Sequence, residues 1–144
     1  MFLKSIPRVA YHLAALGWAL TIFIVSSIPG NELPEVDIVN FDKLVHLGVY
    51  ALLAFLVYLS FRHQMRYPML FRLAILSAFL ACAFYGGTDE IHQLWIPGRT
   101  CDIWDWTSDT LGAALGVLVG WYFERWLGGP SSSQGGSTTS DTSL

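Results

Sequence analysis

Three short segments of the sequence carry side chains that could do acid–base or binding chemistry. In the first, Asp42, His46 and Tyr50 recur every four residues, so on a helix they cover an arc of about 80°. A carboxylate one turn away can orient an imidazole, so we predict that Asp42 orients His46 as a general base. A hydrogen-bonded core histidine would have the same spacing, and both interpretations stay open.

The other two segments add acids that share a helical face. Asp89, Glu90 and Gln93 fall within an arc of about 100°, and three aspartates of the third segment fall within about 60°: Asp102, Asp105 and Asp109. The same stripe continues through Gly112, Gly116 and Gly120. Small residues at this spacing let helices approach closely, so the side that carries the aspartates is predicted to pack against protein.

These segments hold more negative than positive charge. Their six acids are Asp42, Asp89, Glu90, Asp102, Asp105 and Asp109, against the two bases Lys43 and Arg99. The excess needs water, protonation, charged histidine or a bound cation to offset it. Asp42 and Lys43 could be a solvated helix start, and Arg99 could be an ion-pair tie to Glu90 or Asp102. Two histidines and several carboxylates could coordinate a divalent ion, but no recognised metal-ligand spacing is present, so we assign no residue to a metal and predict no cofactor.

The composition indicates which elements must position these groups. Of 144 residues 53% are hydrophobic and 13% charged, too few polar groups to cover a free soluble domain of this size. Apolar runs at residues 9–28, 44–61, 73–96 and 103–126 are each long enough to cross a bilayer. We therefore predict an all-α, integral membrane four-helix bundle over residues 1–127, with a disordered Ser/Gly-rich tail at 128–144. A net charge of −3 argues against nucleic-acid binding.

Charge in the short loops predicts the orientation. With both ends of the chain cytoplasmic (N-in, C-in), six basic residues lie inside and two outside; the inside set is Lys4, Arg8, Arg62, Arg66, Arg72 and Arg125. The three polar segments then share one level near the outer surface. Aromatic residues at the inner boundary are predicted to form an interfacial belt: Tyr11, Tyr58, Trp121, Tyr122 and Trp126.

The motifs resemble those of the VanZ-like family of small bacterial membrane proteins. Asp42-Lys43-x-x-His46-x-x-x-Tyr50 is similar to its first motif, and Glu90-x-x-Gln93 with Pro97-Gly98-Arg99 to its second. The third is matched by Asp105, Gly112 and Gly116, with Asp109 where the family usually has asparagine. The resemblance covers about residues 9–125 and implies a multi-pass protein of the bacterial cytoplasmic membrane. Its namesake is linked to teicoplanin resistance, and the resemblance supplies no reaction.

Three kinds of function fit these observations. The first is an outward-facing cell-envelope site that binds an amphiphile, either a lipid-linked wall precursor or a lipoglycopeptide such as teicoplanin. Membrane lipids would surround the protein. Its catalytic residues would be His46, Asp42, Glu90 and Arg99, and its ligand-binding residues Lys43, Tyr50, Gln93, Asp102, Asp105 and Asp109. The second is a proton- or cation-linked conduit, against which the inner halves offer only His12 as an ionisable residue. The third is a structural or assembly protein whose ion network fixes helix packing.

Overall fold

The computed structural model describes residues 7–32, 41–64 and 66–127, and these form helices with no strand among them. The long helices are α1 (Arg8–Ser26), α2 (Phe41–His63), α4 (Ala74–Gln93) and α5 (Ile103–Trp126), each overlapping one predicted run. A single 3₁₀ turn, η2 (Gly30–Glu32), follows α1. The short helix α3 (Pro68–Arg72), which begins at a proline, was not predicted. The proposed tail at 128–144 and Lys4 lie outside the described residues.

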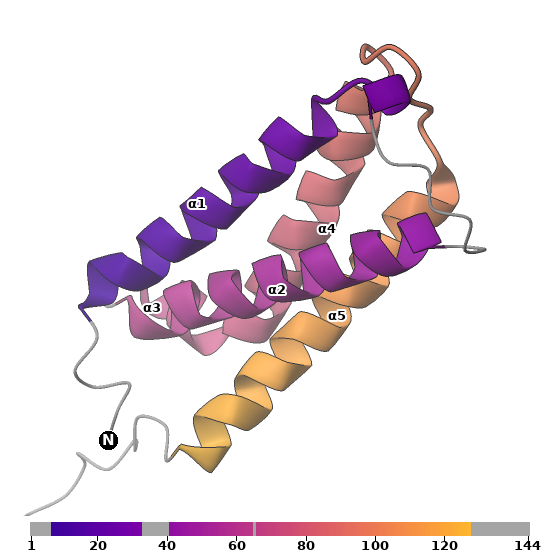
Figure 1. Cartoon of the computed structure of the whole chain (residues 1–144). Helices are drawn as coiled ribbons and strands as arrows, with labels where there is room; N and C mark the ends of the chain where they lie inside the picture. Colours follow the sequence, from indigo (N-terminus) through magenta and orange to yellow (C-terminus); the bar gives the residue numbers. More distant parts are fainter. Residues whose placement is uncertain (1–6, 33–40, 65, 128–144) are drawn as a thin grey trace, which may run out of the picture.

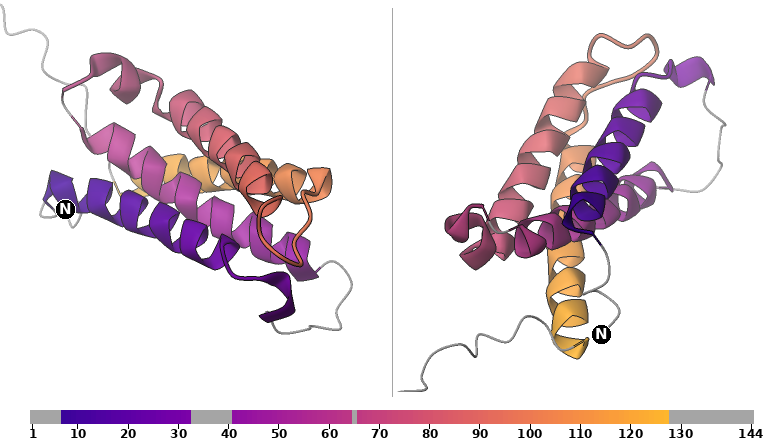
Figure 2. Two further views of the ribbon diagram at one scale, coloured as in Figure 1. Left: turned by 90° about the horizontal axis from the view of Figure 1, so that it is seen from above. Right: turned by 90° about the vertical axis from the view of Figure 1, so that its left-hand side faces the viewer.

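Helix α2 lies at the centre and packs against every other α-helix (Figures 1 and 2). Its most extensive contact is with α5, and the glycines of α5 explain why. A Cβ at Gly112 or Gly116 would collide with the backbone carbonyl oxygen of Leu47 or Ala51 on α2. The prediction that the glycine stripe packs is confirmed.

One end of the molecule gathers the polar segments. The end of α1, η2, the start of α2, the end of α4 and the start of α5 all lie together there (Figure 1). The loop after α4 is held against the turn after α1, because Gly30 N–H donates to the Pro97 carbonyl over 2.9 Å. Gly98 takes a positive φ of 73°, which glycine adopts without strain.

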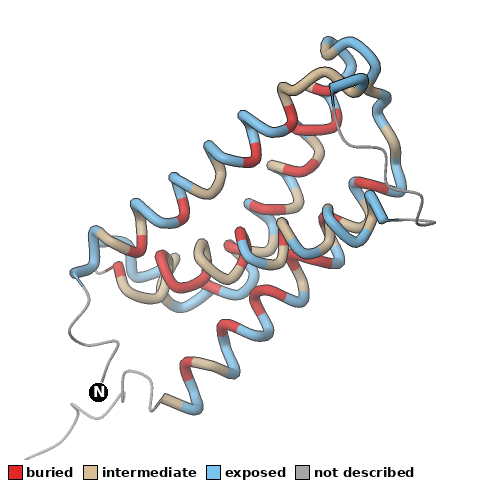
Figure 3. Tube along the Cα trace, viewed as in Figure 1, coloured by how far each residue is buried: buried red, intermediate tan, exposed pale blue. Residues whose placement is uncertain are grey.

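The outer surface of the helices differs from that of a soluble protein. Buried positions on each helix face the neighbouring helices, and the outer sides are exposed (Figure 3). Those outer sides carry large apolar side chains, among them Leu13, Leu16, Leu20, Leu80 and Leu118. Helices α1 and α2 are long and apolar enough to cross a membrane, whereas α4 carries acids near its end and α5 near both ends. Exposed apolar surface of this extent is consistent with a membrane protein.

Two aromatic residues do not belong to the predicted interfacial belt. Tyr58 is 1% exposed and donates a hydrogen bond to Glu124 on α5, and Tyr11 is buried with its ring stacked on His63. Both lie on the packed sides of their helices. Their positions near the helix ends predicted exposure at an interface, and this prediction was wrong. Trp121, Tyr122 and Trp126 are exposed, as a belt requires.

Candidate functional site

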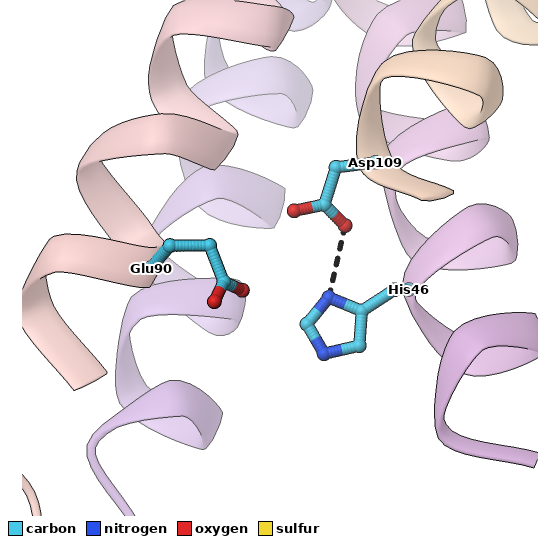
Figure 4. Close-up of side chains that lie close together, drawn as sticks. All are labelled: His46, Glu90 and Asp109. Carbon is cyan, nitrogen blue, oxygen red and sulfur yellow. Dashed lines mark hydrogen bonds and ion pairs between the residues drawn. The ribbon is translucent and has the colours of Figure 1, made fainter. Parts of the chain in front are cut away.

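The site is built around His46, Glu90 and Asp109, which come from α2, α4 and α5. Nδ1 of His46 donates to Oδ1 of Asp109 over 2.9 Å, and the Glu90 carboxylate faces the pair from the opposite helix (Figure 4). One donor atom from each residue lies within 4.8 Å of the others. Asp109 is 0% exposed and Glu90 3%.

The orienting partner of His46 is therefore Asp109 and not Asp42. Asp109 lies one turn before Gly112, so the close approach of α5 to α2 brings its carboxylate to the imidazole. Helix α4 also makes room for it, since a Cβ at Gly86 would lie 3.0 Å from Asp109 Oδ2. Asp42 instead forms an ion pair with Lys43.

Two oxygens of this cluster have no hydrogen-bond partner among the described residues. They are Oε1 of Glu90 and Oδ2 of Asp109, and both are buried. The other Glu90 oxygen, Oε2, accepts the backbone N–H of Asp102 over 2.8 Å. A buried carboxylate oxygen without a donor is costly, so each of these two oxygens can accept a proton, a hydrogen bond from water or a cation.

Lys43 is the centre of an adjoining ion-pair network. Its Nζ lies 3.0 Å from Asp42, 3.1 Å from Asp102 and 2.8 Å from Asp105, which ties the first turn of α2 to the first turn of α5. Asp102 is also the N-cap of α5, because its Oδ1 accepts the N–H of Trp104 over 2.9 Å. That N–H and the Lys43 ammonium lower the pKa of Asp102 below its ordinary value. Asp42 and Lys43 therefore form more than a solvated helix start, because Lys43 also pairs with Asp102 and Asp105.

Arg99 does not tie Glu90 or Asp102. Its guanidinium lies 3.4 Å from the Ile28 carbonyl and 3.5 Å from that of Val25, at the end of α1. Within the described chain it has no carboxylate partner. The turn at Gly98, packed on Gly30, directs Arg99 toward α1 and away from the acids.

A cavity of about 500 Å³ lies beside the cluster. Its apolar wall comes mainly from α1 and the exposed side of α2, and includes Trp18, Ile22, Val25, Val45 and Val49. Its polar wall includes five of the predicted site residues, Asp42, His46, Tyr50, Gln93 and Arg99. Glu90 and Asp109 adjoin the cavity without lining it, and Asp42 is the one member of the Lys43 network that lines it. His46 belongs to both the cavity and the cluster.

Two further residues at this end were not assigned to the site from the sequence. Asp89, which the sequence placed on one face with Glu90 and Gln93 but not among the catalytic or ligand-binding residues, is buried and lines the cavity. His92 forms a hydrogen bond of 3.0 Å with Ser27, and its ring lies against Phe23, so it fixes α4 to α1.

A second buried polar network lies at the other end of the helices. Glu124 Oε2 accepts hydrogen bonds from the Tyr58 hydroxyl (2.7 Å) and from Arg62 Nε (2.8 Å). Glu124 follows Gly120 by four residues and so continues the glycine stripe, a signal that the sequence interpretation missed. Nearby, His12 forms a 2.6 Å hydrogen bond with Ser60, in line with a structural role for that histidine.

The arrangement can therefore hold a proton or a cation between three helices and present an imidazole, an amide and a guanidinium to a ligand in the cavity. No curated protein and no solved structure matches the chain. The family model described as VanZ/LLP1 matches residues 3–124, which is most of its length. The chain therefore belongs to the VanZ/LLP1 family, as its motifs predicted.

Proposed function

We propose that this chain is a four-span cell-envelope protein of the bacterial cytoplasmic membrane that binds the polar head of an amphiphile. Helices α4 and α5 would cross beside α1 and α2, with both ends of the chain cytoplasmic. The acids near the end of α4 and the start of α5 would lie in the outer leaflet. There they are buried against protein, with Asp89 also lining the cavity, which is how membrane helices carry ionisable groups.

The cavity carries this proposal. Its volume falls within the range of about 300–1,000 Å³ that small-molecule sites have. Apolar residues of α1 and α2 line one side, and the exposed outer surface of α1 continues them toward the position of the lipid. An acyl or prenyl chain can occupy that side while its head group meets the polar wall.

The polar wall indicates the class of head group. Arg99 has no carboxylate partner among the described residues, so it can take an anionic group such as phosphate or carboxylate. Asp42 and Asp89 can accept hydrogen bonds from hydroxyl, amide or amino groups, and the Gln93 amide can pair with either kind. Lipid-linked wall precursors and lipoglycopeptides such as teicoplanin combine these groups. His46, held by Asp109, lines the cavity and can hydrogen-bond the head group.

Filling the cavity tests the proposal. Val25→Trp adds bulk to the lined side of α1, and the control Ile24→Trp places the same side chain at the neighbouring exposed position, outside the lining. Binding of teicoplanin and of a lipid-linked wall precursor is measured on the purified chain in mild detergent. We expect Val25→Trp to weaken binding by about tenfold or more, which is about 1.4 kcal/mol, while Ile24→Trp matches wild type. Equal binding by the two variants would refute the site.

The alternatives have their own outcomes. A conduit predicts proton or cation flux into liposomes that Glu90→Gln abolishes, whether or not an amphiphile is present. A structural role predicts that His46→Ala, Glu90→Ala and Arg99→Ala all lower the folded yield while no ligand binds. If the same alanine variants lose teicoplanin tolerance while their folded yield stays that of wild type, the amphiphile site is supported.

A further inference from the structure

The cluster of His46, Glu90 and Asp109 offers more to a ligand than hydrogen bonds. We infer that these three residues bind a divalent transition-metal cation, and this inference does not depend on the amphiphile. The three donors come from three helices and lie within 4.8 Å of one another. Figure 4 shows their polar groups directed at a common space.

A second observation points to a cation in this space. Glu90 Oε1 and Asp109 Oδ2 are buried oxygens with no donor among the described residues, on side chains that are 3% and 0% exposed. A helix bundle could satisfy such oxygens with a serine, an asparagine or a lysine. Here no described side chain donates a hydrogen bond to either oxygen, and a metal ion would supply the missing partner.

The charges around the cluster lead to the same conclusion. Lys43, the nearest fixed cation of the adjoining network, is already shared by three aspartates. Arg99 contacts carbonyl oxygens of the α1 end. His46 is then the only basic side chain that the described residues give to Glu90 and Asp109. A divalent ion would balance both carboxylates with His46 neutral, which is the form that binds metal.

The donor set selects the kind of metal. One imidazole nitrogen with two carboxylates suits Zn²⁺ or Mn²⁺, whereas Mg²⁺ and Ca²⁺ favour oxygen ligands alone. Bonds of about 2.0–2.2 Å place neighbouring ligands about 3–4 Å apart, so the three groups need to close by less than about 2 Å. Three protein ligands leave a coordination position for water or for an oxygen of a ligand in the cavity, which His46 borders.

Metal binding is tested on the full chain in mild detergent, after chelator treatment. The exposed Cys101 is changed to serine in every sample so that its thiol does not contribute. Zn²⁺ and Mn²⁺ are titrated by calorimetry, and the bound metal is counted by mass spectrometry. We expect one ion per chain, and a loss of affinity of about tenfold or more in Glu90→Gln and in Asp109→Asn.

The matched control is Glu124→Gln, which changes a buried acid with its own unpaired oxygen at the other end of the helices. It should bind metal as the parent does. Equal metal affinity in Asp109→Asn and the parent, or no bound ion in the parent, would overturn the inference. Protons would then be what neutralises the carboxylates of Glu90 and Asp109. Because Co²⁺ reports its ligands by visible absorption, its spectrum in the parent decides the matter even where a variant fails to fold. Nitrogen and oxygen ligation is expected, and a thiolate band would contradict the site.

Discussion

The contact between α5 and α2 predicts the effect of one added methyl group. In Gly116→Ala the new Cβ would lie 2.8 Å from the Ala51 carbonyl carbon and closer still to its oxygen. An ordinary contact starts at 3.4 Å, so the helices must separate by about 0.6 Å or more at this point. Overpacking of this kind costs about 1–3 kcal/mol, against a gain in helix propensity of up to about 1 kcal/mol.

The control is Gly48→Ala on α2. A Cβ there meets nothing within 4 Å, so only the gain in propensity applies. Unfolding is measured in mixed micelles by titration with a denaturing detergent and followed by circular dichroism. We expect Gly116→Ala to unfold earlier than wild type and Gly48→Ala to unfold at the same point or later. Equal midpoints for the two variants would refute the close contact, and with it the placement of Asp109 beside His46.

Three further predictions concern other parts of the fold. Arg62→Ala should destabilise the protein by about 3–5 kcal/mol and Tyr58→Phe by about 1 kcal/mol, because only the first leaves the buried charge of Glu124 unpaired. The same detergent titration measures both variants. A larger loss in Tyr58→Phe than in Arg62→Ala would contradict the network. Gly98→Ala should cost about 1–2 kcal/mol, since φ is 73° there, and an unchanged thermal midpoint would show that the turn is relaxed. Asp102 has a lowered pKa, so its ionised form stabilises the fold above the ordinary aspartate pKa and this effect is lost as the pH falls through the lower folded value. The difference in thermal midpoint between wild type and Asp102→Ala should therefore shrink on acidification, and a constant difference would contradict the interaction.

Much of the fold could be predicted from the sequence because local patterns determine it. Apolar runs gave four long helices, and the four-residue glycine spacing identified the face on which α5 packs. The same stripe brought Asp109 to the interior. These are properties of single helices, and the sequence contains them directly.

The partners of the site residues depend on packing between helices, which spacing does not reveal. Asp42 lies one turn from His46 along α2, yet Asp109, distant in sequence, reaches the imidazole because α5 approaches so closely. Asp42 forms an ion pair with Lys43 instead. The alternative that Arg99 ties Glu90 or Asp102 was wrong for the same reason, since its guanidinium lies at the end of α1 beside the turn at Gly98. The site residues were named from motifs, and their pairing needed the structure.

The separation of His46 and Asp109 along the chain has a consequence for biogenesis. During synthesis, α2 emerges with its histidine long before the helix that carries the matching aspartate. Until α5 docks, Lys43 has only Asp42 beside it, and Glu90 lacks the N–H of Asp102. A chain halted before α5 would therefore leave His46 and Glu90 without these partners, so the polar interior is completed only when the last helix has been made.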